Sequence, residues 1–501
     1  MENLPIISLL LLLLTILLFS AIGRSKSKRR SKLPPGPPPL PLIGNFHQIA
    51  GKPFHQYFRR LSKTYGSLVH VKLGSRSVIV ANSSKMAEQI LKSQDLNFCS
   101  RPPLLALHKL SYGGFDMAFA PYGPYWREMR KLSLLHLLSS ARVKSFRPIR
   151  EDEVATLIGK ISGKASRSET VNLSDEIVFL TSTIISRIAF GKRFEHGSGE
   201  SRAFDRNILE FQTALSGFYW TDYFPRLAWL DRLTGKTDHL DRVFRSWDSF
   251  YQNLIDEHSA TDRPETMHRD VLDILLQLRD DESRLFDISL DQIKAILMDV
   301  FFASTDTVAT TLVWAMTALV KNPAAMAAAQ EEIRSVAGKR KKMVEEEDIA
   351  AASLPYFNAV LKESLRMYFP IPLLLGREAI RGCAVGGFEI PAAALVYVNG
   401  WALSRDPEVW ENPEEFRPER FMEGEEKLWV GQDLGFIPFG AGRRGCPGIT
   451  MAVATLETVL ANLLYAFDWK VPEGMKVDTE ALTGITLHKK YPLCLVANNF
   501  I

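Results

Sequence analysis

The segment between residues 289 and 322 constrains the fold most, because it predicts one long helix with an apolar middle. Ser289 and Gln292 form a capping-box pattern at its start, and Asn322-Pro323 ends it. At 1.5 Å per residue, about thirty residues give a helix of roughly 50 Å. Residues 296–303 (ILMDVFFA) are apolar on nearly every side, so we expect other helices to surround them.

Polar side chains follow directly after this apolar segment, at Ser304-Thr305-Asp306-Thr307. Polar groups in a buried helix cost free energy unless they have partners, and threonine hydroxyls often bond back to helix carbonyls. A local kink or satisfied threonines would account for this segment. A carboxylate and a hydroxyl that deliver protons to a bound ligand would account for it equally well.

The rest of the chain predicts a mainly helical body with a minor sheet. Apolar, β-branched runs at 67–71 (SLVHV) and 77–80 (SVIV) indicate two strands, and strand-like pieces (FEIP, LVYV, YPLCLVA) return after residue 380. Most of the remaining pattern has a helical period, with no internal repeat and no second linker. We therefore expect one continuous body over residues 45–501.

The loop Phe439–Gly448 reads FGAGRRGCPG and holds the main candidate ligand, Cys446. A lone thiolate in a rigid, glycine-rich loop can bind iron end-on, and the glycines let the backbone approach a flat ligand. Arg444, two residues before the cysteine, can meet a nearby negative charge. A buried free cysteine beside a turn is the alternative, and it is the commoner role of cysteine in general.

A third candidate site is the pair Glu363 and Arg366, which can meet at i, i+3 on a helix. Most such pairs are exposed and contribute little to stability. Arg420, in the segment FRPERF before the cysteine loop, can join them in a buried network that holds the loop in place.

The N-terminus carries a membrane signal. Residues 4–22 contain no charge and would span about 28 Å as a helix, close to the thickness of a hydrocarbon core. Basic residues crowd positions 24–32, whereas only Glu2 is charged before the apolar run, so the chain after residue 23 should be cytosolic. A cleaved signal peptide is the alternative, with the opposite charge asymmetry. We predict an anchor over 1–23, a basic and proline-rich hinge over 24–44, and a catalytic domain over 45–501.

Composition narrows the function further. The net charge of +4 is small for 501 residues and does not suggest a nucleic-acid-binding protein. The four cysteines are widely scattered and form no CxxC pair, so neither a zinc site nor a disulfide framework is indicated.

These motifs carry a family resemblance. The cysteine loop, the Glu363/Arg366 pair with Arg420, and the segment 303–307 occur in the order and spacing of the cytochrome P-450 haem-thiolate monooxygenases. The anchor and the proline-rich hinge resemble microsomal members. WREMR (126–130), FRPERF and PFGAGRRGCPG resemble the plant A-type group of specialised metabolism. The resemblance implies the cytochrome P-450 fold, mainly α with minor β, behind an N-terminal single-pass transmembrane anchor.

The resemblance also implies how a haem is held. Cys446 would be the axial ligand of the iron of haem b, where a thiolate favours O–O cleavage. Phe439 would pack beside the thiolate, and Gly448 belongs to the same cofactor loop. Arginine suits the haem propionates because it pairs well with carboxylates. The implied propionate-binding residues are Trp126, Arg130, Arg377 and Arg444, and Arg101 matches this role less well.

Asp306 and Thr307 would steer protons to bound dioxygen, and Glu363, Arg366 and Arg420 would be structural. The family usually has glycine where this chain has Ser304, whose hydroxymethyl group would crowd the substrate or hydrogen-bond to it. Val308 stands where threonine or serine is frequent. Neither change removes the proton-delivery pair.

The resemblance assigns mostly apolar segments to the substrate pocket, which indicates a neutral, hydrophobic small molecule. The segments LTSTII (180–185) and YVNGWALSRDP (397–407) look closest to plant members that act on amino-acid-derived oximes, phenolics and related aromatics. The implied pocket residues are Phe115, Phe302, Ala303, Ser304, Leu373 and Ile485.

The implied activity is insertion of one oxygen atom from dioxygen into such a substrate at the endoplasmic reticulum membrane. Electrons would come from NADPH through the NADPH–cytochrome P-450 reductase, because no G-x-G-x-x-G follows a strand here. Cytochrome b5 is a further implied partner, and a basic face that includes Arg443 would meet an acidic partner.

Three alternatives remain from the sequence. One is a haem-thiolate isomerase, dehydratase or ring-coupling enzyme. The second is a terpenoid or alkaloid hydroxylase. The third is a non-catalytic haem-binding or membrane-scaffold protein.

Overall fold

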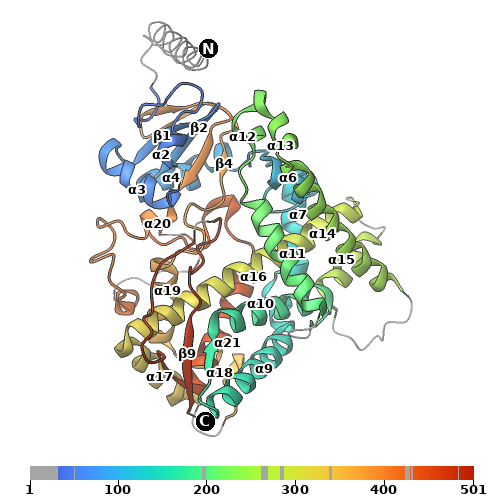
Figure 1. The fold of residues 1–501 in the computed structure, drawn as a ribbon, viewed down its shortest axis with the longest axis vertical. Helices are drawn as coiled ribbons and strands as arrows, with labels where there is room; N and C mark the ends of the chain where they lie inside the picture. The colour runs from blue at the N-terminus through green and yellow to red at the C-terminus, as the bar shows by residue number, and fades with distance from the viewer. Residues whose placement is uncertain are drawn as a thin grey trace, which may run out of the picture.

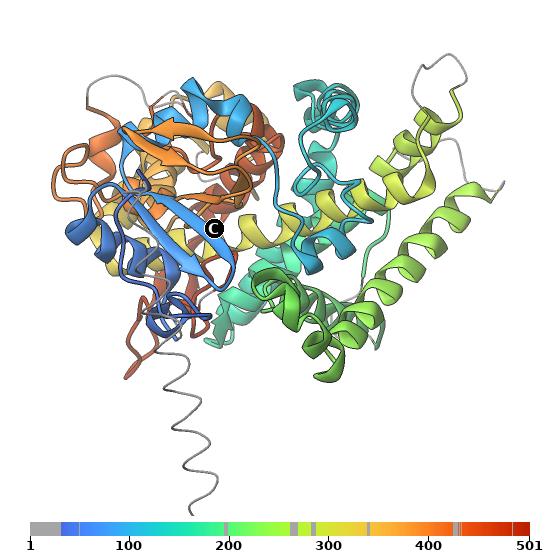
Figure 2. The ribbon, with the colours of Figure 1, turned by 90° about the horizontal axis from the view of Figure 1, so that it is seen from above.

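The structure, a computed structural model, has a strand-rich part packed beside a larger helical part, with helix α16 (Leu290–Lys321) running through the centre (Figures 1 and 2). The expectation of a mainly helical fold with a minor sheet is confirmed. The structure describes residues 32–49, 51–194, 199–260, 269–281, 287–337, 341–423, 429, 431, 433–482 and 484–500. The anchor predicted over residues 1–23 lies outside the described residues.

The main sheet has four strands in the order β1-β2-β7-β4. The two strands expected near the N-terminus form the antiparallel hairpin of β1 (Leu68–Leu73) and β2 (Arg76–Ala81). Strand β2 pairs in parallel with β7 (Leu395–Val398), and β4 (Arg377–Glu378) closes the sheet. Because a parallel pair needs a long crossover, most of the helical part of the chain lies between β2 and β7.

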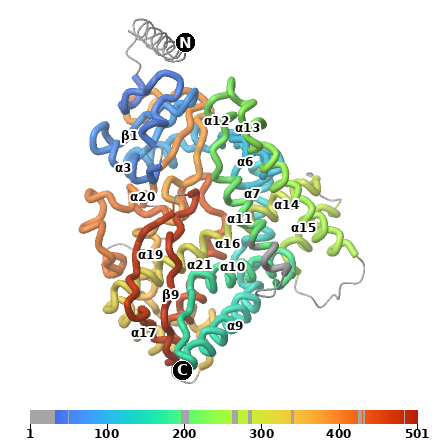
Figure 3. The backbone as a smooth tube through the Cα atoms, viewed as in Figure 1, coloured from blue at the N-terminus to red at the C-terminus, as the bar shows by residue number. Residues whose placement is uncertain are grey.

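Two smaller sheets complete the strand content. Strand β9 (Cys494–Asn499) pairs with β3 (Thr170–Asn172) and with β8 (Phe467–Lys470), and so brings the C-terminus beside helix α9 (Arg147–Ala165) (Figure 3). Strands β5 (Cys383–Val385) and β6 (Phe388–Ile390) form a hairpin.

Helix α16 begins and ends as the sequence predicts. Ser289 and Gln292 cap each other's backbone N–H groups, at 3.3 and 2.9 Å. Residues 293–301 are all buried. Helix α16 packs against α10 (Leu173–Phe190), α19 (Pro355–Met367) and α21 (Ile449–Ala466). The hydroxyls of Thr305 and Thr307 donate to the carbonyls four residues earlier, at 2.8 and 2.7 Å, which satisfies them inside the helix.

Helices α16 and α21 are long and apolar enough to cross a membrane, but two-thirds of each apolar window is buried inside the protein. Their hydropathy is therefore that of core helices. Within the described residues, the remaining α-helices are α2 (Phe46–Ile49), α3 (Phe54–Tyr65), α4 (Ser84–Glu88), α5 (Asp95–Phe98), α6 (Leu105–Leu110), α7 (Pro124–Leu132), α8 (Ser140–Ser145), α11 (Gly199–Leu215), α12 (Trp220–Tyr223), α13 (Trp229–Leu233), α14 (Lys236–Ser259), α15 (Val271–Arg279), α17 (Pro323–Ala337), α18 (Glu346–Ala351) and α20 (Gly400–Leu403). Shorter helical turns are η1 (Gln89–Ser93), η2 (Ser133–Leu137), η3 (Pro225–Leu227), η4 (Pro418–Phe421) and η5 (Gly442–Arg444).

Candidate functional site

A deep cavity lies between α16 and the cysteine loop. Both Thr307 and Cys446 belong to its lining, together with residues of α10 and α21. About 1600 Å³ of space is free of protein atoms there, the opening included. Residues from several elements therefore enclose one continuous space beside Cys446.

The backbone of the loop holds the Cys446 sulfur at one wall of the cavity. Gly440 and Gly442 both have φ of 71°, a conformation that side chains disfavour. A Cβ atom at Gly442 would also lie 2.2 Å from the carbonyl oxygen of Leu91. The Cys446 amide donates to the carbonyl of Phe439 at 2.9 Å, which closes the loop.

Opposing effects act on the pKa of the Cys446 thiol. Burial raises the pKa of the Cys446 thiol, whereas the Gly448 N–H and the charge of Arg130 act to lower it. The exposed surface of Cys446 faces the cavity, because protein atoms enclose the residue on its other sides. Helix α21 starts at Ile449, so its positive N-terminal end also favours a thiolate there.

Four arginines converge on the same cavity, and their environment fits a dianionic ligand. Within the described residues, Arg101, Arg130 and Arg444 donate hydrogen bonds only to backbone carbonyls, and Arg377 also pairs with Asp95 at 3.1 Å. Burial lowers the pKa of Arg444 to about 10 and shifts the pKa of Arg101 and Arg377 in the same direction. Buried cations without carboxylate partners are costly, so two propionates would relieve this arrangement.

Trp126 and Phe439 occupy supporting positions. Trp126 is not part of the cavity lining: its indole N–H donates to the carbonyl of Met117 at 2.9 Å, and its ring lies under the Arg444 guanidinium at 4.1 Å. Phe439 lines the cavity beside the cysteine loop, as does Gly448. Trp126 therefore orients Arg444 instead of facing the cavity itself.

One face of α16 forms part of the cavity wall. Val300, Ala303, Ser304, Thr307 and Thr311 line the cavity at the i, i+3, i+4, i+7 and i+11 spacing of a single helix face. Ser304 makes no hydrogen bond with the part of the chain that the structure describes, so its hydroxyl is available to a ligand.

Asp306 points away from this face and is not in the cavity lining. Its Oδ1 atom accepts a hydrogen bond from Gln212 of α11 at 2.8 Å and lies 3.0 Å from Nε2 of His488. The sequence predicts that Asp306 and Thr307 act as a pair. The structure places them on adjacent faces of α16, with only Thr307 reaching the cavity.

Four of the expected pocket residues lie outside the cavity lining. Phe302 stacks on Phe211 at 3.7 Å, because it is rotated by one residue from the face that carries Ala303. Leu374 and Leu375 line the cavity where Leu373 was expected. Phe115, which packs on Tyr125, and Ile485 are also absent from the lining.

Two buried carboxyl groups near the cavity were not anticipated. Asp299 lines the cavity and accepts a hydrogen bond from the Met117 amide at 2.5 Å, and Asp116 accepts from the Phe119 amide at 3.0 Å. The two carboxyls lie beside each other, and burial raises the pKa of Asp299 to about 7 and shifts the pKa of Asp116 in the same direction. The sequence signal was a lone aspartate inside the apolar segment 296–303.

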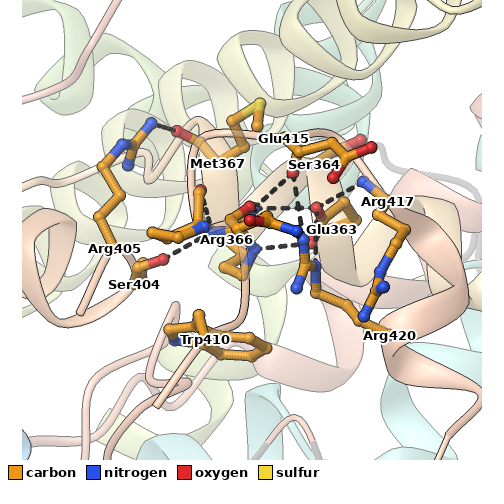
Figure 4. A network of polar contacts seen from close by, with 12 residues as sticks. Glu363, Ser364, Arg366, Met367, Ser404, Arg405, Trp410, Glu415, Arg417 and Arg420 are labelled. Atoms are coloured by element: carbon orange, nitrogen blue, oxygen red, sulfur yellow. Dashed lines mark hydrogen bonds and ion pairs between the residues drawn. The ribbon is translucent and has the colours of Figure 1, made fainter. Parts of the chain in front are cut away.

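The charged residues Glu363, Arg366 and Arg420 meet in a buried network (Figure 4). Glu363 pairs with Nε of Arg366 at 2.6 Å and with Nε of Arg420 at 3.2 Å. Arg366 also donates to the carbonyls of Ser404 and Pro413, at 2.7 and 2.8 Å. The network therefore ties α19 to the segment that leads into the cysteine loop.

Comparison with known proteins identifies the family. The family model of cytochrome P-450 matches residues 34–495. The chain is 46% identical over 471 residues to 6,7,8-trihydroxycoumarin synthase of Pastinaca sativa, with 92% of each chain covered. It is 44% identical over 499 residues to phenylacetaldehyde oxime monooxygenase of Prunus mume, covering 97% of this chain and 93% of the relative. A zebrafish cytochrome P-450 structure determined with progesterone superimposes with a TM-score of 0.76 at 24% identity, over 89% of this chain and 100% of the other.

The chain therefore belongs to the cytochrome P-450 family, and it is a haem-thiolate monooxygenase. The cavity, the cysteine at its wall and the convergent arginines fit the haem that this family implies. Because these relatives are named as enzymes, the chain is an oxidoreductase. The alternative of a non-catalytic haem-binding or membrane-scaffold protein is therefore dropped.

Proposed function

We propose that the protein is a membrane-anchored monooxygenase that inserts one oxygen atom from dioxygen into a small hydrophobic aromatic compound, a phenolic or an amino-acid-derived oxime. The observation that carries the proposal is that Thr307 and Cys446 line the same cavity. A thiolate-held iron and a proton-donating hydroxyl would thus act on the same small volume.

Some of the site residues would bind the haem, and others would transfer protons. Cys446 would ligate the haem iron, and Arg130, Arg377, Arg444 and Arg101 would meet the two propionates. When bound, a haem with a thiolate ligand supplies the activation of dioxygen. Thr307 lines the cavity, with its hydroxyl donating to the Ala303 carbonyl, and Asp306 lies one residue earlier, so together they would pass protons inward.

Two observations support the proposed substrate class: the apolar lining of the cavity and the names of the relatives. Val300, Ala303, Leu374 and Leu375 make most of the wall apolar, and Ser304 adds one hydroxyl. The relatives are named for a hydroxylated coumarin and for phenylacetaldehyde oxime, both aromatic molecules with a polar group. An apolar wall with one available hydroxyl suits such molecules.

Electrons would come from NADPH through the NADPH–cytochrome P-450 reductase, with cytochrome b5 as an accessory donor. The protein would lie on the endoplasmic reticulum membrane through residues 1–23, with the catalytic domain in the cytosol. The uncharged run over residues 4–22 and the basic residues after it support this placement.

The reduced, CO-bound spectrum of the full-length protein in microsomes tests the haem ligand. The red-shifted Soret band specific to a thiolate ligand should appear, and Cys446→Ser should abolish it while the far-UV circular dichroism is kept. An unchanged band in the variant would remove the assignment of Cys446.

Incubation with reductase, NADPH and a panel of phenolics, oximes, terpenes and alkaloids tests the substrate class. We expect oxygen-dependent products from phenolics or oximes. Product formed only from terpenes or alkaloids would overturn the substrate class. Product formed without oxygen would instead indicate the isomerase or dehydratase alternative.

A further inference from the structure

The carboxylate of Asp306 is held by two side chains from distant parts of the chain. Gln212, on α11, donates from Nε2 to Oδ1 at 2.8 Å, and Nε2 of His488 lies 3.0 Å from the same oxygen. Nδ1 of His488 lies 3.1 Å from the hydroxyl of Thr310, one turn further along α16. His488 is therefore bonded through both ring nitrogens to one helix.

Of the two partners, only His488 can supply a proton. The amide of Gln212 donates a hydrogen bond but does not ionise near neutral pH, whereas imidazole titrates there. The His488 side chain is 40% exposed and the Asp306 side chain 18%, and neither residue lies in the cavity lining. The ring thus has accessible surface outside the lining and contacts a carboxylate that is one residue from Thr307.

The charge environment favours a protonated ring. Burial lowers the pKa of His488, but the hydrogen bond and the charge of Asp306 raise it by more, so the net shift is upward from the ordinary value of 6.5. The neighbouring cations are engaged elsewhere: Lys489 pairs with Asp478 and Lys490 with Glu480, at 2.7 and 2.8 Å. Asp306 is therefore the carboxylate that faces His488 among the described residues.

We infer that His488 is the residue that positions Asp306 and resupplies its proton, so that protons reach Thr307 by the order His488, Asp306, Thr307. This inference rests on the proposed function, because Asp306 and Thr307 must be the proton-handling pair. Reducing one oxygen atom to water takes two electrons and two protons. The reductase supplies the electrons, and water recharges His488 after each transfer.

The geometry also predicts a role for pH. A protonated His488 donates from Nε2 to Asp306, and this state predominates at pH values below the raised pKa of His488. The supply is lost as the pH rises through the raised pKa of His488. The rate of NADPH consumption in the reconstituted enzyme should fall over that range.

Variants of His488 show whether the residue supplies protons or only packs against Asp306. In full-length protein reconstituted with reductase and 7-hydroxycoumarin, His488→Gln should lower NADPH consumption about tenfold at pH 6 and flatten its pH profile. His488→Arg keeps the ion pair with Asp306 but does not release a proton, so it should be as slow as His488→Gln. Full activity in His488→Arg would overturn proton supply by His488.

Two control variants test whether the effects are specific to His488. Gln212→Leu removes the other hydrogen bond to the same oxygen, and it should keep the pH profile of the wild type. Lys490→Gln removes a positive charge from the same loop without touching Asp306, and it should leave both rate and profile unchanged. A flattened profile in Gln212→Leu would show that packing around Asp306, and not His488, sets the pH response.

A spectroscopic measurement gives an outcome independent of turnover. In the diamagnetic ferrous-CO state, the imidazole ¹³C resonance of His488, assigned by its loss in His488→Gln, should titrate above pH 6.5. Asp306→Asn should move that pKa downward. A His488 pKa that is unaffected by Asp306→Asn would contradict the coupling.

Thr307→Ala and Asp306→Asn, measured in parallel, separate this inference from the proposed function. If Thr307→Ala leaves the ratio of peroxide to product unchanged and Asp306→Asn leaves the rate unchanged, the proton-handling pair is wrong and the inference falls with it. If these variants have their effects and the His488 variants have none, only the role of His488 is wrong.

Discussion

Arg130 donates a hydrogen bond from Nη2 to the carbonyl oxygen of Gly445 at 2.7 Å, so helix α7 holds the residue directly before Cys446. The same guanidinium lines the cavity, where its charge acts on the thiol. One side chain therefore joins the backbone of the cysteine loop to the electrostatics of the cavity.

Arg130→Gln should weaken haem retention by about ten- to a hundredfold, because it removes this hydrogen bond and one cavity cation, together worth about 1.5–3 kcal/mol. Haem content after dialysis against apomyoglobin measures the effect. Arg127→Gln, an exposed position on the same helix, should retain haem as the wild type does. Equal retention in both variants would show that Arg130 does not help to hold the cofactor.

Glu363→Gln should destabilise the protein by about 3–5 kcal/mol, since it leaves the guanidiniums of Arg366 and Arg420 buried without their carboxylate. The midpoint of urea unfolding, followed by circular dichroism, measures this change. Glu169→Gln, which breaks an exposed ion pair with Arg167, should leave the midpoint in place. A Glu363→Gln midpoint equal to that of wild type would show that the network does not stabilise the fold.

Asp299→Asn should flatten the dependence of stability on pH. Burial raises the pKa of Asp299 to about 7, so its folded state favours the protonated form. That contribution to stability is fully present below the unfolded pKa near 3.8 and is lost as the pH rises through about 7.

Thermal midpoints between pH 5 and 8 test this prediction. The wild type should lose stability with rising pH relative to Asp299→Asn. Asp291→Asn, at an exposed position in the first turn of the same helix, should behave as the wild type. Parallel curves for wild type and Asp299→Asn would contradict the raised pKa.

Ser304→Gly should weaken binding of a phenolic ligand more than that of its non-phenolic analogue. The hydroxyl of Ser304 is available in the cavity wall, and one hydrogen bond is worth about 1 kcal/mol, or roughly fivefold in affinity. Spectral titration with 7-hydroxycoumarin and coumarin measures the difference. Ser304→Ala separates the hydroxyl from the added volume, and equal affinities in all three proteins would remove Ser304 from substrate recognition.

Local features were predictable from the sequence because neighbouring residues decide them. The cap formed by Ser289 and Gln292 depends on two residues three positions apart, and the structure has it. The β1–β2 hairpin likewise follows from two apolar, β-branched runs separated by a tight turn at Gly74. The spacing of the cysteine loop pointed to a ligand for the same reason.

The orientation of α16 was not predictable. Its middle is apolar all round, so the sequence pattern did not show which face meets the cavity. Phe302 was expected in the pocket beside Ala303 and Ser304, but only the latter two line it. The pairing of Asp299 with Asp116 was invisible for a different reason, since it depends on how the loop before α7 packs onto α16.

By itself the sequence determined the long central helix, the short strands and the glycine-rich loop that presents Cys446, because backbone propensity, capping and spacing act over a few residues. Only the tertiary structure decided which partner each buried charge has: Gly445 for Arg130, Asp116 for Asp299, and His488 with Gln212 for Asp306. These pairs join segments far apart in the chain, and a buried charge takes whichever partner the packing of the helices brings within hydrogen-bonding distance.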